Sequence, residues 1–89
     1  MKVLLMTWTF GEDYLVCQFF MEHTESWNDE LDYLMNLVQE YGFHNRSKAT
    51  VRMRLQNYVY LHNGDKGLSN VAKQSRDIYS AIKKRWKIL

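Results

Sequence analysis

Hydrophobic residues recur at three- and four-residue steps in four segments of this chain, and polar or glycine-containing stretches separate the segments. Such spacing places apolar side chains on one face of an α-helix. The pattern therefore predicts an all-α fold, a compact domain of four helices with one shared core.

The first segment begins with Thr9 and Glu12, which have the spacing of a capping box. We expect a helix that starts after Thr9 and runs to about His23. Its apolar positions surround most of the helix, so it should be the most buried one. They are Tyr14, Leu15, Cys17, Phe19, Phe20 and Met21.

The second segment follows a cap at Ser26 or Asn28 and is closed by Gly42, which suits the left-handed position after a helix. Its apolar residues at helical steps are Leu31, Leu34, Met35, Val38 and Tyr41. Three acidic residues crowd the expected first turn, where they complement the helix dipole: Asp29, Glu30 and Asp32.

The third segment has Ser47 as its expected N-cap and joins the second through the short turn 42–46. Two helices joined by a few residues that include glycine, the second one basic, are typical of a helix-turn-helix arrangement. The inward stripe is Val51, Leu55, Tyr58 and Val59. The other faces are left with Lys48, Arg52, Arg54, Gln56 and Asn57.

A loop rich in turn signals, residues 62–67, precedes a fourth helix that we expect Ser69 or Asn70 to cap. Its core face holds Val71, Ile78, Ile82 and Trp86, and its last turns hold Lys83, Lys84, Arg85 and Lys87. The whole chain is thus predicted to be one domain, with an N-terminal arm at 1–6, a helix-turn-helix core at 7–62 and a basic C-terminal helix at 69–89.

Charge is divided along the chain far more sharply than the net charge of +2 suggests. Residues 1–43 contain one basic and eight acidic residues, whereas residues 44–89 contain eleven basic and two acidic ones. A basic half favours a polyanionic partner, and an acidic half can bind a second protein. The separation permits a homodimer but does not require one.

Residue types for catalysis or metal binding are sparse. The lone Cys17 cannot form an internal disulfide and favours a reducing compartment, and the three histidines lack metal-ligand spacing. The apolar run within residues 1–6 is shorter than a signal-peptide core, and no stretch reaches membrane-spanning length. We expect a cytoplasmic protein that is not an enzyme and has no cofactor, no metal and no membrane partner.

Two sequence resemblances add to this interpretation. Residues 7–15, TWTFGEDYL, resemble the opening of Myb and SANT-like repeats. Residues 46–58 (RSKATVRMRLQNY), followed by KGLSN at 66–70 and RDIY at 76–79, are similar to the helical N-terminal module of prokaryotic HNH-type restriction endonucleases. The second resemblance covers roughly residues 7–84 and implies a small nucleic-acid-binding module. The resemblance does not include the nuclease domain of that family, so it does not imply cleavage.

Two functional hypotheses follow. In the first, the chain is a duplex-DNA-binding module of a prokaryotic or phage defence or regulatory system, in which the third helix reads base edges and other cations neutralise phosphates. The expected contacts are Arg46, Lys48, Arg52, Arg54, Gln56, Asn57, Lys83, Lys84, Arg85 and Lys87. In the second, a phage or mobile-element protein inhibits a host CRISPR or restriction complex through Asp29, Glu30 and Asp32.

Overall fold

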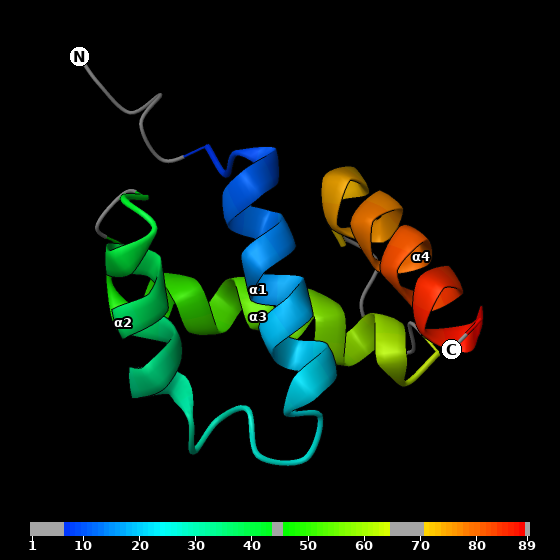
Figure 1. Ribbon diagram of the computed structural model, residues 1–89, viewed down its shortest axis with the longest axis horizontal. Coiled ribbons are helices and arrows are strands. Elements are labelled where there is room, and N and C mark those ends of the chain that lie inside the picture. The colour runs from blue at the N-terminus through cyan, green and yellow to red at the C-terminus, as the bar shows by residue number, and fades with distance from the viewer. Residues whose placement is uncertain (1–6, 44–45, 65–70, 89) are drawn as a thin grey trace.

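The computed structural model describes residues 7–43, 46–64 and 71–88, with only the backbone described for 86–88. Within these ranges the chain is all-helical, as predicted, and contains no strand. The helices are α1 (Phe10–Glu22), α2 (Leu31–Glu40), α3 (Lys48–His62) and α4 (Lys73–Ile88) (Figure 1).

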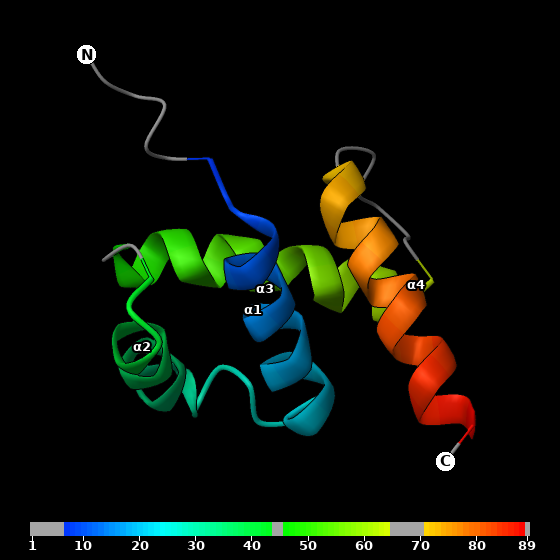
Figure 2. The same ribbon diagram turned by 45° about the horizontal axis from the view of Figure 1, so that its top comes forward.

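Helices α1 and α3 form the centre of the molecule, because each of them packs against all the other helices. Helices α2 and α4 lie on opposite sides of this pair and do not contact each other (Figures 1 and 2). The acidic α2 and the basic α4 are therefore held apart by the fold.

Local capping signals set the limits of three helix ends as predicted. The Thr9 hydroxyl accepts a hydrogen bond from the Glu12 amide at 3.2 Å, and the Glu12 carboxylate accepts one from the Thr9 amide at 2.9 Å, which completes the capping box. Ser47 caps α3 by accepting from the Thr50 amide at 3.1 Å. Gly42 follows α2 with a φ of 75°, the left-handed conformation that glycine adopts without strain.

The start of α2 differs from the prediction. The helix begins at Leu31, with Glu30 as its N-cap and no side-chain capping bond, and residues 24–30 form turns instead. Trp27 packs against the core from these turns, so a tertiary contact outweighs the local caps at Ser26 and Asn28. Asp32 alone of the three expected acidic residues lies in the first helical turn. The expected caps Ser69 and Asn70, the arm 1–6 and the Trp86 side chain lie outside the described residues.

The core is continuous through all four helices. It contains most of the predicted inward residues, while Trp8 and Leu15 are half-buried at its edge. Cys17 is fully buried, and burial together with the charge of Asp13 raises the pKa of its thiol to about 12. The buried hydrophobic members of the cluster are Val16, Cys17, Phe19, Phe20, Leu31, Leu34, Val38, Val51, Leu55, Tyr58, Ile78, Tyr79 and Ile82.

Candidate nucleic-acid interface

The structure separates the ten predicted contact residues into three groups. Arg46 is buried and Arg54 and Asn57 form polar contacts within the domain, Lys48, Arg52 and Gln56 lie farther out on α3, and three cations line the C-terminal half of α4. The side chain of Lys87 lies outside the described residues. A single surface that contains all ten does not exist.

Arg46 is buried rather than available to a nucleic acid, which corrects its prediction. Its side chain retains only 2% exposure, and its Nη2 and Nε donate to the two carboxylate oxygens of Glu12 at 2.9 and 3.2 Å. Nη2 also donates to the Thr7 carbonyl at 2.8 Å. Burial alone would raise the pKa of Glu12, but the hydrogen bonds from Arg46 and Thr9 outweigh it and hold that pKa at about 2.

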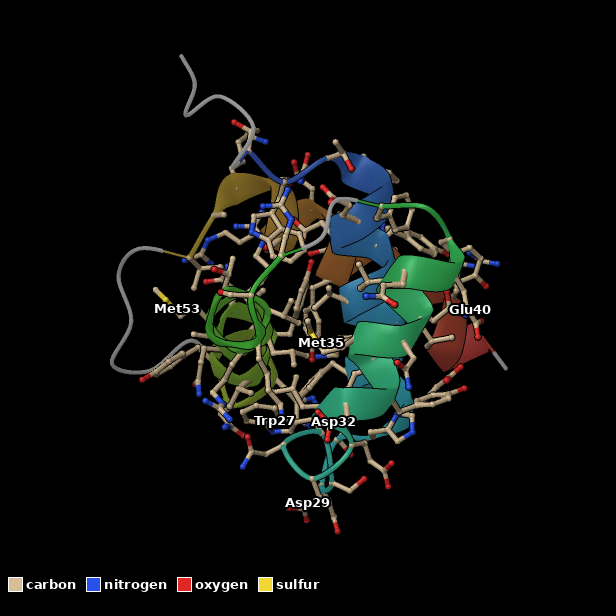
Figure 3. The ribbon with its side chains drawn as sticks, turned by 90° about the vertical axis from the view of Figure 1, so that its left-hand side faces the viewer. Trp27, Asp29, Asp32, Met35, Glu40 and Met53 are labelled. Carbon is tan, nitrogen blue, oxygen red and sulfur yellow. The ribbon has the colours of Figure 1, made fainter. Side chains whose placement is uncertain are left out.

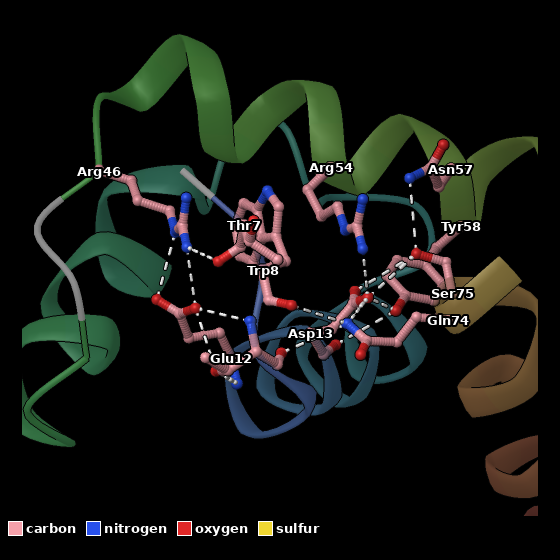
Figure 4. A network of polar contacts seen from close by, with 11 residues as sticks. Thr7, Trp8, Glu12, Asp13, Arg46, Arg54, Asn57, Tyr58, Gln74 and Ser75 are labelled. Atoms are coloured by element: carbon pink, nitrogen blue, oxygen red, sulfur yellow. Dashed lines mark hydrogen bonds and ion pairs between the residues drawn. The ribbon is translucent and has the colours of Figure 1, made fainter. Parts of the chain in front are cut away.

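Arg54, in the second turn of α3, also pairs with an acid, although its side chain keeps 14% exposure. Its Nη2 lies 2.6 Å from Oδ2 of Asp13, whose side chain is fully buried. Burial and the Asp13 charge raise the pKa of Tyr58, whose hydroxyl donates to Asp13 Oδ1. Gln74 and Ser75 of α4 donate to Asp13 Oδ2 at 3.0 and 3.2 Å. One carboxylate thus connects α1, α3 and α4 (Figure 4).

Trp8 lies between the two guanidinium groups. The Cζ atoms of Arg46 and Arg54 are 4.2 and 5.3 Å from the centroid of its ring, within the range of cation–π contact (Figure 4). Asn57 belongs to the same region, since its Nδ2 lies 3.5 Å from the Ser75 hydroxyl. Trp8 therefore anchors the N-terminus of α1 to α3.

The role of Asp13 was not foreseen, although its position contains a signal. The sequence analysis identified Glu12 as part of a capping box, which the structure confirms, but predicted no partner for its neighbour Asp13. Asp13 precedes Val16, Cys17 and Phe20 at steps of three, four and seven residues, and all three are core residues. A carboxylate on the apolar stripe of a buried helix requires donors from other elements.

The outward part of α3 carries less positive charge than its sequence suggests. Lys48 pairs with Asp32 of α2 at 2.7 Å, and Arg52 donates to Asn28 Oδ1 at 3.3 Å, both on the surface. Met53 is 72% exposed and borders an open hollow of about 240 Å³ that Trp8, Thr50, Arg54 and Asn57 also line. In Figure 3 Met53 points away from the side of the molecule on which Glu40 lies.

Helix α4 provides the strongest positive surface. Its sequence contains six basic residues and one acidic residue, and Lys83, Lys84 and Arg85 are exposed. Arg85 donates to the Tyr14 hydroxyl at 2.8 Å, and Lys83 Nζ is 5.7 Å from the Tyr79 ring centroid. Within the described ranges no carboxylate pairs with any of these three, whereas Lys73 pairs with Asp77 one turn along the same helix.

Other kinds of site find little support. Among the residues that the structure describes, no three His, Cys, Asp or Glu side chains gather in a way that could hold a metal ion. No helix in the described ranges combines the length and the apolar character needed to cross a membrane. Comparison with family models, curated proteins and solved structures gives no match to this chain.

Proposed function

We propose that this domain binds duplex DNA, with α4 as its main phosphate-contacting element. The observation that carries the proposal is the exposed cluster of Lys83, Lys84 and Arg85, which no described carboxylate neutralises. Unpaired cations on one helix gain most from phosphate contact, because binding releases the counterions condensed on DNA. The α4 face also lies on the far side of the molecule from the acidic α2, which a phosphate backbone would repel.

Helix α3 is the candidate for base contact within this proposal. In a helix-turn-helix arrangement of α2 and α3, the outward residues of α3 would face the major groove. Arg52 is exposed and Gln56 is half-exposed, and both residue types make paired hydrogen bonds with base edges. Arg46, Arg54 and Asn57 are omitted from the interface because their polar groups are engaged within the domain.

Fluorescence anisotropy with a labelled random duplex at low salt tests the proposal. If four cations, Lys83, Lys84 and Arg85 among them, each contact a phosphate, log affinity should fall with log salt at a slope of about −3.6. Lys83→Gln combined with Lys84→Gln should lessen that slope by about 1.8. Lys73→Gln is the matched control, since Lys73 already pairs with Asp77 on the same helix. Absence of binding at about 100 μM, the weak limit of ordinary non-specific association, would refute DNA as the partner.

A base-reading role for Arg52 has a separate signature. Loss of an arginine that contacts a guanine edge should cost about 1 to 3 kcal/mol at the preferred sequence and less at others. Loss of a phosphate contact weakens all sequences equally. Binding of Arg52→Gln to a selected site and to random duplex, compared side by side, distinguishes the two roles.

A second candidate function is a protein-binding role for the acidic half, as in a phage or mobile-element inhibitor of a host CRISPR or restriction complex. The observation that favours it is the exposure of Asp29 and Glu30, which form no ion pair within the described ranges. Asp32 is also exposed but pairs with Lys48. Reversal of these three charges should abolish binding to such a complex and leave DNA affinity unreduced, whereas Lys83→Gln with Lys84→Gln should do the opposite.

A further inference from the structure

Helix α2 carries a second apolar stripe beside the one that faces the core, and this stripe contacts the core only at its edge, where the Tyr33 ring lies 6.4 Å from that of Phe19. Leu31, Leu34 and Val38 face the core, while Tyr33, Leu37 and Tyr41 follow each other at four-residue steps on a neighbouring face. Tyr33 is 52% exposed and Tyr41 is 63% exposed. A ten-residue surface helix packs on its domain through one apolar stripe, so the second stripe can contact another molecule.

This stripe forms one wall of a groove between α2 and α1. Two adjoining hollows of about 210 and 240 Å³ share Leu15, Gln18 and Tyr41 as lining residues. The other lining residues are Gly11, Tyr14, Phe19, Glu22, Tyr33, Leu37 and Phe43. Phe10 is 61% exposed, and its ring centroid lies 6.0 Å from that of Tyr14, a lining residue at one end of the groove. Two of the four large hydrophobic side chains that stand exposed in the described ranges, Tyr33 and Tyr41, therefore line this groove.

The charge around the groove selects the kind of occupant. Glu22 lines it, no lysine or arginine is among its lining residues, and Glu40 directly precedes the lining residue Tyr41, while Arg85 donates to the Tyr14 hydroxyl at one end. Neither acid forms an ion pair within the part of the chain that the structure describes. Exposed aromatic residues beside the acidic Glu22 and Glu40 match a helix that has an apolar ridge and basic flanks. The ten residues of α2 span about 15 Å, enough to accompany about three turns of such a helix.

We propose that the groove between α1 and α2, defined by Tyr33, Leu37, Tyr41 and Leu15, is a docking site for a basic amphipathic helix of a partner protein. Tyr33 and Tyr41 serve as anchors on the apolar ridge, and Glu22 and Glu40 face its cations. The inference does not depend on DNA binding by α4. It gives the second candidate function a defined surface and a partner of defined chemistry.

The test uses fluorescence anisotropy of the full chain with three labelled peptides of about 14 residues. The first has leucines at helical steps of three and four with lysines between them, the second carries glutamates in place of the lysines, and the third is a scramble of the first. The first should bind, and the other two should bind at least about tenfold more weakly. Equal binding of the first peptide and its scramble would show that charge attraction alone causes the binding, and it would overturn the proposal.

Substitutions on the protein locate the site. Tyr33→Ser and Tyr41→Ser should each lower the affinity for the first peptide about tenfold. Circular dichroism should show unchanged helix content, because both side chains are exposed. Met53→Ser is the matched control, since Met53 is also exposed but lies on another face. Unchanged affinity in the tyrosine variants, or an equal loss with Met53→Ser, would refute the site. Lys83→Gln with Lys84→Gln should leave the peptide affinity undiminished, so failure of this proposal is distinguishable from failure of DNA binding.

Two other occupants would contradict the proposal. Sedimentation equilibrium that shows a dimer which Tyr33→Ser and Tyr41→Ser dissociate would assign the groove to a second copy of the chain. Peptide binding that appears only after removal of residues 1–6 would assign it to the protein's own N-terminal residues.

Discussion

Glu12 and Asp13 are adjacent in the sequence, but their carboxylates bind different partners and connect different helices. Glu12 closes the capping box of α1 and forms a bidentate pair with Arg46, while Asp13 receives donors from α3 and α4. The separation along the chain between each acid and its arginine is 34 and 41 residues. Local patterns cannot reveal such partners. The sequence analysis therefore offered Arg46 and Arg54 to a nucleic acid, whereas in the fold their guanidinium groups bind Glu12 and Asp13.

The lowered pKa of Glu12 predicts a specific acid sensitivity. Its folded-state pKa of about 2 lies below the ordinary value of 4.5, so its contribution to stability is complete above pH 4.5 and is lost as the pH falls toward 2. The shift corresponds to about 3 kcal/mol. Urea unfolding from pH 6 to pH 2 should show this loss in the native protein and much less of it in Glu12→Gln. Glu22→Gln, an exposed change on the same helix, should retain the native pH dependence.

Substitution of Asp13 tests the buried network. Asp13→Ala would leave Arg54 and Tyr58 without their acceptor in a buried setting, and we expect a loss of about 3 to 5 kcal/mol in the free energy of unfolding. Asp77→Ala removes an exposed pair with Lys73 and should cost less than about 1 kcal/mol. Chemical denaturation of both variants gives the comparison, and similar losses in the two would contradict a central role for Asp13.

At the scale of the elements, the helices with strong local signals were predicted well. The capping box of α1, the Ser47 cap of α3 and the glycine after α2 depend on neighbouring residues, so they can be read from the sequence. The start of α2 depends on Trp27, which packs on the core from a turn and prevents the helix from beginning earlier. The groove between α1 and α2 was missed because Tyr41 was assigned to the core stripe of α2, although its side chain is mostly exposed.

Helix α3 contains matched positions for a stability test. Leu55 is fully buried in the core, and Leu55→Ala should lower the free energy of unfolding by about 2 to 5 kcal/mol through lost burial and the cavity left behind. Met53→Ala, two positions earlier on the exposed face, should change it by no more than about 0.5 kcal/mol. Thermal and urea unfolding followed by circular dichroism measures both, and a loss below about 1 kcal/mol for Leu55→Ala would contradict the described core.

At the scale of the whole molecule, Cys17 reports whether the domain opens. Its thiol is fully buried, and the raised pKa of about 12 keeps it protonated at neutral pH. A thiol reagent at pH 8 should therefore label the native protein only through unfolding, at a rate that rises in step with the unfolded fraction as urea is added. Fast labelling without denaturant, as fast as that of a free thiol, would show that α1 is not held between its neighbours.

The position of Asp13 at the meeting point of α1, α3 and α4 has a consequence for how the chain folds. Its donors come from residues 41 to 62 positions away, so a collapsed intermediate that assembles only one or two of these helices would bury the carboxylate before its partners arrive. Burial of an unpaired carboxylate is costly, which raises the free energy of every partly assembled state. The network should therefore make folding more cooperative, with all three helices joining in one transition rather than by stepwise addition.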